Sequence, residues 1–187
     1  MKVAFVNGKG GVGKTTAAIM IAATLREAGH KVWIDDRDPQ GSATLLAPNL
    51  GLSLGRAEES TVMIIDTAPR LDHTPTIAAI QEADIVVLVC SPSPADLGTT
   101  VQTASIVSKY RNGPTVILLN SVVKNTRLAR NVTDLNLPFP TLANVITRRQ
   151  VYQIATLQGW VALTSEAREE LFRAALEIVS AYQQVSR

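Results

Sequence analysis

Short apolar runs recur along the chain with helical stretches between them. Each run is apolar throughout instead of alternating with polar residues, which is typical of strands that helices cover on both faces. The pattern therefore predicts an α/β fold, built as a doubly wound and mostly parallel sheet with helices on both faces. The runs lie at residues 2–7, 31–35, 61–66, 84–90, 115–120 and, more weakly, 142–146.

Two of the intervening stretches carry clear helical patterns. Residues 14–28 are rich in small and aliphatic side chains, and Gly29 follows where a helix commonly ends in the left-handed conformation. Residues 164–185 place apolar side chains at three- and four-residue spacing, with glutamates near the start, so we expect a terminal helix docked on the core. Residues 41–60 are rich in Gly, Ser, Ala and Pro, which predicts a loop with at most one short helix.

Length and composition narrow the class of protein. The 187 residues fit one domain, 1–187, and the net charge of +2 leaves DNA binding open. The single cysteine, Cys90, lies in an apolar run, so a buried thiol is expected and no internal disulfide can form. The sequence contains neither a leader pattern nor an apolar run long enough to span a bilayer, so we expect a cytoplasmic protein.

Residues 8–16 read Gly-Lys-Gly-Gly-Val-Gly-Lys-Thr-Thr directly behind the first apolar run. This fits the phosphate-binding P-loop, in which glycines let backbone N–H groups face phosphate oxygens and a helix N-terminus adds partial positive charge. Lys14 would reach the phosphates, and the Thr15 hydroxyl would bind Mg²⁺. The candidate nucleotide-binding residues are Gly8, Lys9, Gly10, Gly11, Val12, Gly13, Lys14, Thr15 and Thr16.

Three aspartates follow strands that would end beside this loop. Asp66 ends the third run and precedes Thr67-Ala68-Pro69, as the carboxylate of a Walker B motif does. Asp36 and Asp38 follow the second run, and parallel strands present their carboxyl ends at one ligand-binding edge. Thr15, Asp66 and Asp36 are therefore candidate Mg²⁺ ligands, the carboxylates acting through water. The alternative is that these aspartates are turn residues.

Lys9 is a second lysine inside the loop, and phosphate binding does not require it. Because of this lysine, the sequence resembles the deviant Walker A family of partition and positioning ATPases, the ParA/MinD group. Within that family it resembles small plasmid partition ATPases of the ParF kind. The resembling segments are Gly8–Thr16, Asp36–Gly41, Ile64–Pro69, Ser91–Leu97 and Ile146–Tyr152.

The resemblance implies an ATPase that uses ATP and Mg²⁺ and works as a homodimer. Lys9 would cross the dimer to the partner's phosphates, since a second cation completes the charge cage only when two chains meet. Lys14 would act in its own site, Asp38 would position the attacking water, and Asp36 would lie nearer Mg²⁺. Adenine would contact Asn120, Thr147 and Arg148.

The family resemblance also implies partners. Small members bind DNA without sequence preference when dimeric and ATP-bound, and a small centromere-binding adaptor stimulates hydrolysis, so we expect a nucleoid-associated protein that segregates DNA or positions a cargo. The chain begins at the P-loop strand, so no N-terminal helix-turn-helix is expected. For any single arginine, a solvated helix face is the alternative. The candidate DNA contacts are Lys124, Arg127, Arg130, Arg149, Arg168 and Arg173.

Two departures from the family pattern leave other functions open. Asp35 replaces an apolar residue, and Arg37 separates Asp36 from Asp38. If Arg37 pairs with Asp38, the protein would be a nucleotide-dependent dimerisation switch that does not hydrolyse ATP. A MinD-like positioning ATPase would need a cationic amphipathic helix, whereas residues 164–185 mix both charges, so no membrane partner is expected. A metabolic ligase is the third alternative.

Overall fold

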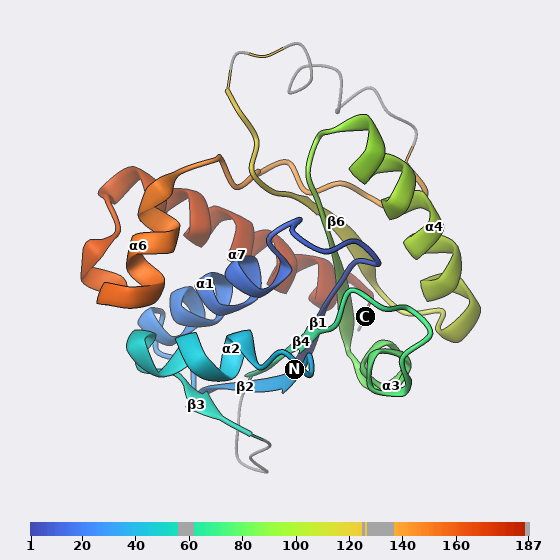
Figure 1. Cartoon of the computed structure of the whole chain (residues 1–187), viewed down its shortest axis with the longest axis horizontal. Coiled ribbons are helices and arrows are strands. Elements are labelled where there is room, and N and C mark those ends of the chain that lie inside the picture. The colour runs from blue at the N-terminus through green and yellow to red at the C-terminus, as the bar shows by residue number, and fades with distance from the viewer. Residues whose placement is uncertain (56–61, 125, 127–136, 186–187) are drawn as a thin grey trace.

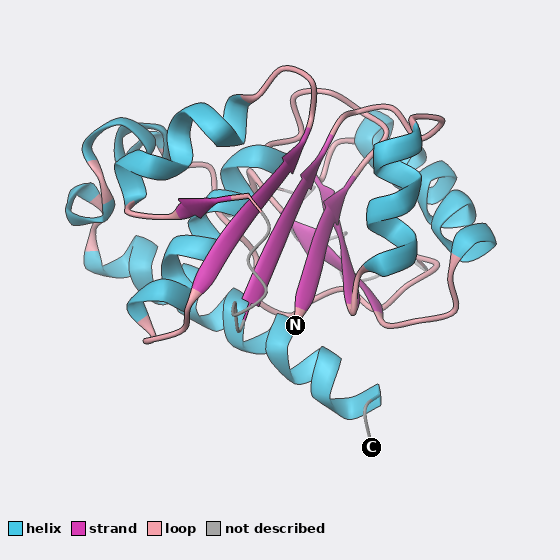
Figure 2. Ribbon diagram, turned by 90° about the horizontal axis from the view of Figure 1, so that it is seen from below, coloured by secondary structure: helices cyan, strands magenta, loops and turns pink. Residues whose placement is uncertain are grey.

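The computed structural model describes residues 1–55, 62–124, 126 and 137–185, which form a six-stranded sheet in the order β3-β2-β4-β1-β5-β6 (Figures 1 and 2). Every strand pairing is parallel, so the predicted doubly wound parallel sheet is confirmed. The strands are β1 (Lys2–Val6), β2 (Val32–Arg37), β3 (Ser53–Leu54), β4 (Val62–Thr67), β5 (Ile85–Cys90) and β6 (Thr115–Leu119).

Helices cover both faces of this sheet (Figure 1). One layer contains α1 (Lys14–Glu27), α2 (Ser42–Leu46), α6 (Gln150–Gln158) and α7 (Ser165–Val185), and the other contains α3 (Thr74–Glu82) and α4 (Pro94–Tyr110). Successive strand side chains point to opposite faces, so Phe5 packs in the first layer and Ala4 in the second. Both faces are buried, which explains why the strands are apolar throughout.

The helix predictions hold at both ends of the chain. The helix expected at 14–28 is α1, and Gly29 follows it with φ +90°. The helix expected at 164–185 is α7, which packs against α1 through buried side chains that include Leu171 and Ile178. No helix among the described residues is long and apolar enough to cross a membrane.

Residues 41–55 contain more structure than the predicted loop. They form α2, the 3₁₀ helix η1 (Ala47–Leu50) and the edge strand β3, which pairs with β2. β3 has two exposed residues, so neither an apolar run nor an alternating pattern could mark it in the sequence.

The weak strand prediction at 142–146 is wrong. This segment runs beside β6, where the Leu142 and Ile146 N–H groups donate to the Ile117 and Leu119 carbonyls at 2.9 and 2.8 Å, but the bridges beside it are isolated pairs at its flanks, Thr141 and Thr147. In the middle of it, the Asn144 side chain and backbone N–H both donate to a glutamate of α7, at 2.7 and 3.1 Å. The α7 contacts therefore replace the regular ladder that a strand would need.

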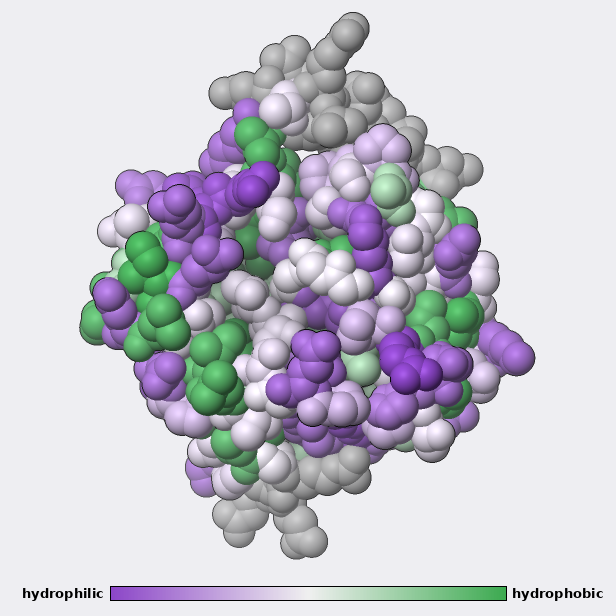
Figure 3. Space-filling view, in the orientation of Figure 1, coloured by the Kyte–Doolittle hydropathy of each residue, from purple (hydrophilic) through white to green (hydrophobic). Residues whose placement is uncertain are grey.

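Some apolar side chains remain exposed on one side of the molecule. Leu45, Leu157 and Val161 are 75%, 70% and 82% exposed, and Figure 3 shows hydrophobic side chains gathered over α2 and α6. Gathered apolar groups of this kind are typical of a protein contact surface.

Candidate functional site

The loop from β1 into α1 turns sharply at the carboxyl edge of the sheet. Gly11 and Gly13 have φ of +80° and +85°, the left-handed region that side chains other than glycine rarely adopt. Gly13 is also crowded, because a Cβ there would lie 2.2 Å from the Asn120 amide nitrogen. Glycine is therefore required at Gly13 both by conformation and by space.

The Asn7 side chain, a backbone carbonyl of β5 and hydroxyls of α4 hold the first turn of the loop. Asn7 is fully buried: its Oδ1 accepts the Lys9 N–H at 2.8 Å, and its Nδ2 donates to the Val89 carbonyl at 2.8 Å and the Thr100 hydroxyl at 3.1 Å. The Gly8 N–H donates to a further threonine hydroxyl of α4 at 3.2 Å. We did not predict Asn7, although a polar residue at the end of an apolar strand was the available signal.

Asn120, at the end of β6, supports the loop from the other side. Its Nδ2 donates to the Val12 carbonyl at 2.8 Å, and the residue is 7% exposed. This contact explains why the loop needs Asn120 even before any base is bound. The predicted contact between Asn120 and adenine stays a prediction.

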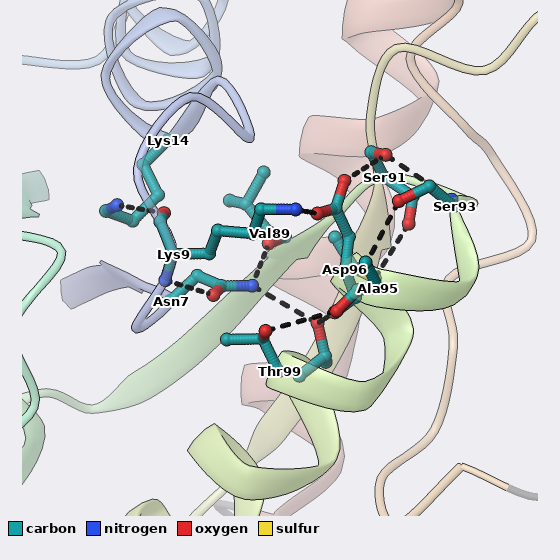
Figure 4. A network of polar contacts seen from close by, with 11 residues as sticks. Asn7, Lys9, Lys14, Val89, Ser91, Ser93, Ala95, Asp96 and Thr99 are labelled. Atoms are coloured by element: carbon teal, nitrogen blue, oxygen red, sulfur yellow. Dashed lines mark hydrogen bonds and ion pairs between the residues drawn. The ribbon is translucent and has the colours of Figure 1, made fainter.

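The two lysines of the loop point away from each other (Figure 4). Lys14 is 6% exposed, and its Nζ lies 3.3 Å from the Lys9 carbonyl. Burial lowers the pKa of Lys14, while the charges of Asp66 and Asp38 oppose that shift. The Lys9 side chain instead extends to α4, where its ammonium pairs with Asp96.

A pocket of about 370 Å³ opens over the loop. Glycine N–H groups, one lysine and threonine hydroxyls together suit a phosphate chain. Gly8, Lys9 and Val12 instead use backbone groups to hold the loop in place. The residues that line the pocket are Gly10, Gly11, Gly13, Lys14, Thr15, Thr16, Asp38, Gln40, Ser42 and Pro69.

Thr15 and Asp66 meet at the inner end of α1. The Thr15 hydroxyl donates to Asp66 Oδ2 at 2.7 Å, while Asp66 Oδ1 is buried with no hydrogen-bond partner among the described residues. Burial raises the pKa of Asp66 to about 7; the charge of Asp36 adds to this, and the Thr15 hydrogen bond opposes it. A buried carboxylate oxygen without a partner, beside a hydroxyl, fits Mg²⁺, which prefers hard oxygen ligands.

The two aspartates after β2 have different surroundings. Asp36 uses both oxygens: Oδ1 accepts the Asp38 N–H at 3.1 Å, and Oδ2 accepts the Thr44 N–H and hydroxyl at 2.7 and 2.9 Å. Asp38 accepts the Gln40 N–H at 3.0 Å and lines the phosphate pocket. Asp36 thus anchors the loop to α2, and Asp38 is the carboxylate that faces the pocket.

Arg37 does not pair with Asp38, so the premise of the non-hydrolysing switch is wrong. Its guanidinium donates to Asp35 Oδ2 at 2.7 and 3.0 Å and pairs with Glu82 of α3. Side chains alternate along a strand, so Asp35 and Arg37 share one face of β2 while Asp36 points to the other. The same pairing explains why an acid stands at position 35.

The segment predicted to hold adenine is bonded to α7 and to the end of β6. The Thr147 N–H and hydroxyl donate to Glu170, the hydroxyl at 2.9 and 3.0 Å, and the Tyr152 hydroxyl donates to the same carboxylate at 2.9 Å. The Arg148 N–H donates to the Val122 carbonyl at 2.9 Å. Base contacts of Thr147 and Arg148 stay predictions.

Two of the candidate DNA contacts pair with acids. Arg149 pairs with Glu170 at 3.5 Å, and Arg173 pairs with Glu169 at 2.6 Å. Arg168 donates to backbone carbonyls and lies over the Trp160 ring. Lys124 is exposed and lines a second pocket together with Arg149 and Arg173. Arg127 and Arg130 lie outside the described residues.

We expect Asp66→Asn to stabilise the protein in the absence of nucleotide and magnesium, because an amide carries no charge to bury. The folded-state pKa of about 7 exceeds the ordinary 3.8, so over this interval the folded protein keeps a proton that the unfolded chain has lost. The wild-type free energy of unfolding must then fall as pH rises through the interval. The variant should gain about 2 kcal/mol at about pH 8 and little at about pH 4.

Denaturant unfolding at the two pH values measures this difference. The control is Asp72→Asn, at an exposed carboxylate paired with Arg70, which should change stability little at either pH. Equal stabilities of Asp66→Asn and the wild type at the higher pH would contradict the costly burial of Asp66.

Known proteins similar to this chain include nucleotide-binding proteins, in agreement with a phosphate-binding site. The family model of the CobQ/CobB/MinD/ParA nucleotide binding domain matches residues 3–159. Two proteins called maintenance of carboxysome distribution protein A are similar to the chain. That of Gloeobacter kilaueensis is 39% identical over 117 residues, covering 54% of each chain. That of Halothiobacillus neapolitanus is 29% identical over 183 residues, covering 84% of each. The matched part thus spans about half of the first relative and most of the second.

Solved structures show the same fold at low sequence identity. A plasmid partition protein of Borrelia burgdorferi, bound to AMPPNP, has a TM-score of 0.75 and 19% identity, covering 96% of this chain and 98% of that one. Cobyrinic acid a,c-diamide synthase of Mycobacterium smegmatis, with an ATP analogue and magnesium, has a TM-score of 0.76 and 20% identity, covering 100% and 96%. Because the family model matches most of the chain, the chain belongs to the CobQ/CobB/MinD/ParA nucleotide-binding family, and the solved structures share its fold.

Proposed function

We propose that this protein is a positioning ATPase of the ParA type, in which ATP joins two copies around their nucleotides and hydrolysis separates them. The observation that carries the proposal is the division of labour between the loop lysines. Lys14 is buried at the pocket, whereas the Lys9 side chain is 41% exposed and leads out of it. A cation in that place is suited to a second molecule rather than to its own site.

Charge balance supports a second cation. Among the described residues that line the phosphate pocket, Lys14 is the one cation, and Asp38 adds a negative charge. A triphosphate carries more negative charge than one lysine and Mg²⁺ offset, and positive charge is most effective where water is excluded. Lys9 of a second copy would supply it and would exclude water at the same time.

The polar side chains in and beside the pocket then have separate tasks in hydrolysis. Thr15 and Asp66 would hold Mg²⁺, which neutralises charge on the phosphate oxygens. Lys14 and the loop N–H groups would hold the phosphates. Asp38 would orient the attacking water, since it faces the pocket, and Asp36 would keep that loop in position through Thr44.

The nature of the cargo is suggested by the relatives. Two of them are named for the distribution of carboxysomes, and the family includes partition proteins of chromosomes. We infer a cargo carried over DNA, either a protein assembly or a plasmid, with a small adaptor that stimulates hydrolysis. The exposed apolar side chains of α2 and α6 offer a contact surface for a partner protein.

A membrane-bound MinD-like role is less well supported. The apolar face of α7 packs on α1, and Glu170 and Glu177 of α7 accept hydrogen bonds from the segment beside β6. The larger apolar side chains of α7 that remain exposed among the described residues are Phe172 and Leu176, which form a small patch for a helix that would have to lie on a bilayer.

The trans role of Lys9 is tested by Lys9→Ala beside Lys14→Ala. Lys14→Ala should abolish ATP binding, because it removes the buried cation of the pocket. Lys9→Ala should keep ATP binding and lose the dimer, measured by sedimentation velocity with Mg-AMPPNP. ATP-dependent dimers that persist in Lys9→Ala would refute the trans role.

The role of Asp38 is tested by turnover. Asp38→Ala should bind ATP, dimerise and lose hydrolysis by about 100-fold or more, because the attacking water is no longer oriented. Asp36→Ala is the comparison. It should lower the melting temperature of the protein, because the Thr44 N–H and hydroxyl lose their acceptor. Normal turnover in Asp38→Ala would move the role of orienting water to another residue.

DNA binding is tested by charge reversal at the pocket that Lys124 and Arg173 line. In the presence of Mg-AMPPNP, Lys124→Glu and Arg173→Glu should each weaken binding to duplexes of unrelated sequence to a similar degree and reduce its salt dependence. The matched control is Lys31→Glu, at the opposite end of the sheet, just before β2. An equal loss in the control, measured by fluorescence anisotropy, would contradict a defined DNA surface here.

A further inference from the structure

The partner of Lys9 within its own chain is a carboxylate held by several bonds. Asp96 lies in the first turn of α4 and is 8% exposed. Its Oδ1 pairs with the Lys9 ammonium, its Oδ2 accepts the Ser91 hydroxyl at 2.5 Å, and its N–H donates to the Ser93 side chain at 3.2 Å (Figure 4). The segment Ser91–Leu97, which the family resemblance singled out without a task, is thus built around this carboxylate.

One ammonium cannot stay on Asp96 and also reach the phosphates of a second copy. We propose that Asp96 is a positioning residue that holds Lys9 within its own protomer and so opposes dimerisation until ATP draws Lys9 to the partner. This inference rests on the proposed trans role of Lys9. On this proposal Asp96 determines how readily the protein dimerises.

The two members of the pair differ in how easily they separate. The Lys9 side chain is 41% exposed, so it can swing away without disturbing the core. The Asp96 side chain is 11% exposed and keeps the Ser91 hydroxyl when Lys9 leaves, together with the partial positive charge at the start of α4. The carboxylate is therefore not left buried without a partner, and the exchange is reversible.

The same face of α4 also holds the loop from which Lys9 extends. Thr100 and Thr103 follow Asp96 at four and seven residues, one face of a helix, and accept hydrogen bonds from Asn7 and Gly8. Asp96 therefore acts on a lysine whose backbone is fixed, so only the side chain has to move. The exchange therefore requires the Lys9 side chain to change position, and it does not require the loop to rearrange.

The test is the dimer dissociation constant with Mg-AMPPNP, measured by sedimentation. Asp96→Asn removes the charge but keeps the shape, so Lys9 is no longer held. A partly exposed ion pair shifts an equilibrium by up to about fivefold, and a dimer releases two pairs, so the constant should fall by up to about 25-fold. Asp96→Glu, which keeps the charge, should return it toward the wild-type value.

Two controls separate this effect from a change in α4 itself. Ser93→Ala removes the helix cap but leaves the Asp96 charge, and should leave the dissociation constant unchanged. AMPPNP affinity of dilute monomer should be equal in the wild type and Asp96→Asn. If Asp96→Asn does not fold, Asp96→Ser makes the same charge deletion, with the same fall expected.

The outcomes are distinct. A wild-type protein that does not dimerise with Mg-AMPPNP would overturn the proposed function. A wild type that dimerises, with Asp96→Asn unchanged or weaker, would overturn the role of Asp96 alone.

Discussion

The turn from β1 into α1 has to leave its backbone N–H groups facing a phosphate, so it relies on bonds to other parts of the fold. Groups from three other elements supply these bonds. Asn7 ties the turn to β5 and α4, Thr103 of α4 accepts the Gly8 N–H, and Asn120 at the end of β6 holds the Val12 carbonyl. The loop is thus rigid before any ligand binds, which lowers the entropy lost when a ligand does bind.

This arrangement has a cost in stability, which is concentrated at Asp66. A carboxylate that is fully buried, with one oxygen lacking a partner among the described residues, disfavours the folded protein when ionised. A divalent cation would reverse that effect, because it gives the charge a counter-ion. The site is therefore unfavourable by itself and favourable with its cofactor, which is typical of functional sites that trade stability for binding.

The pocket is also incomplete in charge, and the lysine suited to complete it is engaged elsewhere. Lys14 lies inside, while Lys9 is held on α4 by Asp96. Under the proposed function, the loop contacts two nucleotides: Lys14 would bind the nucleotide of its own protomer, and Lys9 would bind the nucleotide of the second copy. The contact surface between copies would then be set by where the Lys9 side chain points rather than by a large apolar face.

The sequence alone determined the local chemistry: the P-loop with Lys14 and Thr15, the acid at the end of β4, and the strands and helices that place them at one edge. These follow from short-range pattern, because glycine spacing, apolar runs and strand ends are properties of neighbouring residues. Only the tertiary structure decided the partners. Arg37 pairs with Asp35 and Glu82 instead of Asp38, Asn144 bonds to α7 within a segment that forms no strand, and Lys9 meets an aspartate 87 positions away. The order of strands in the sheet sets such contacts, and no local spacing encodes it.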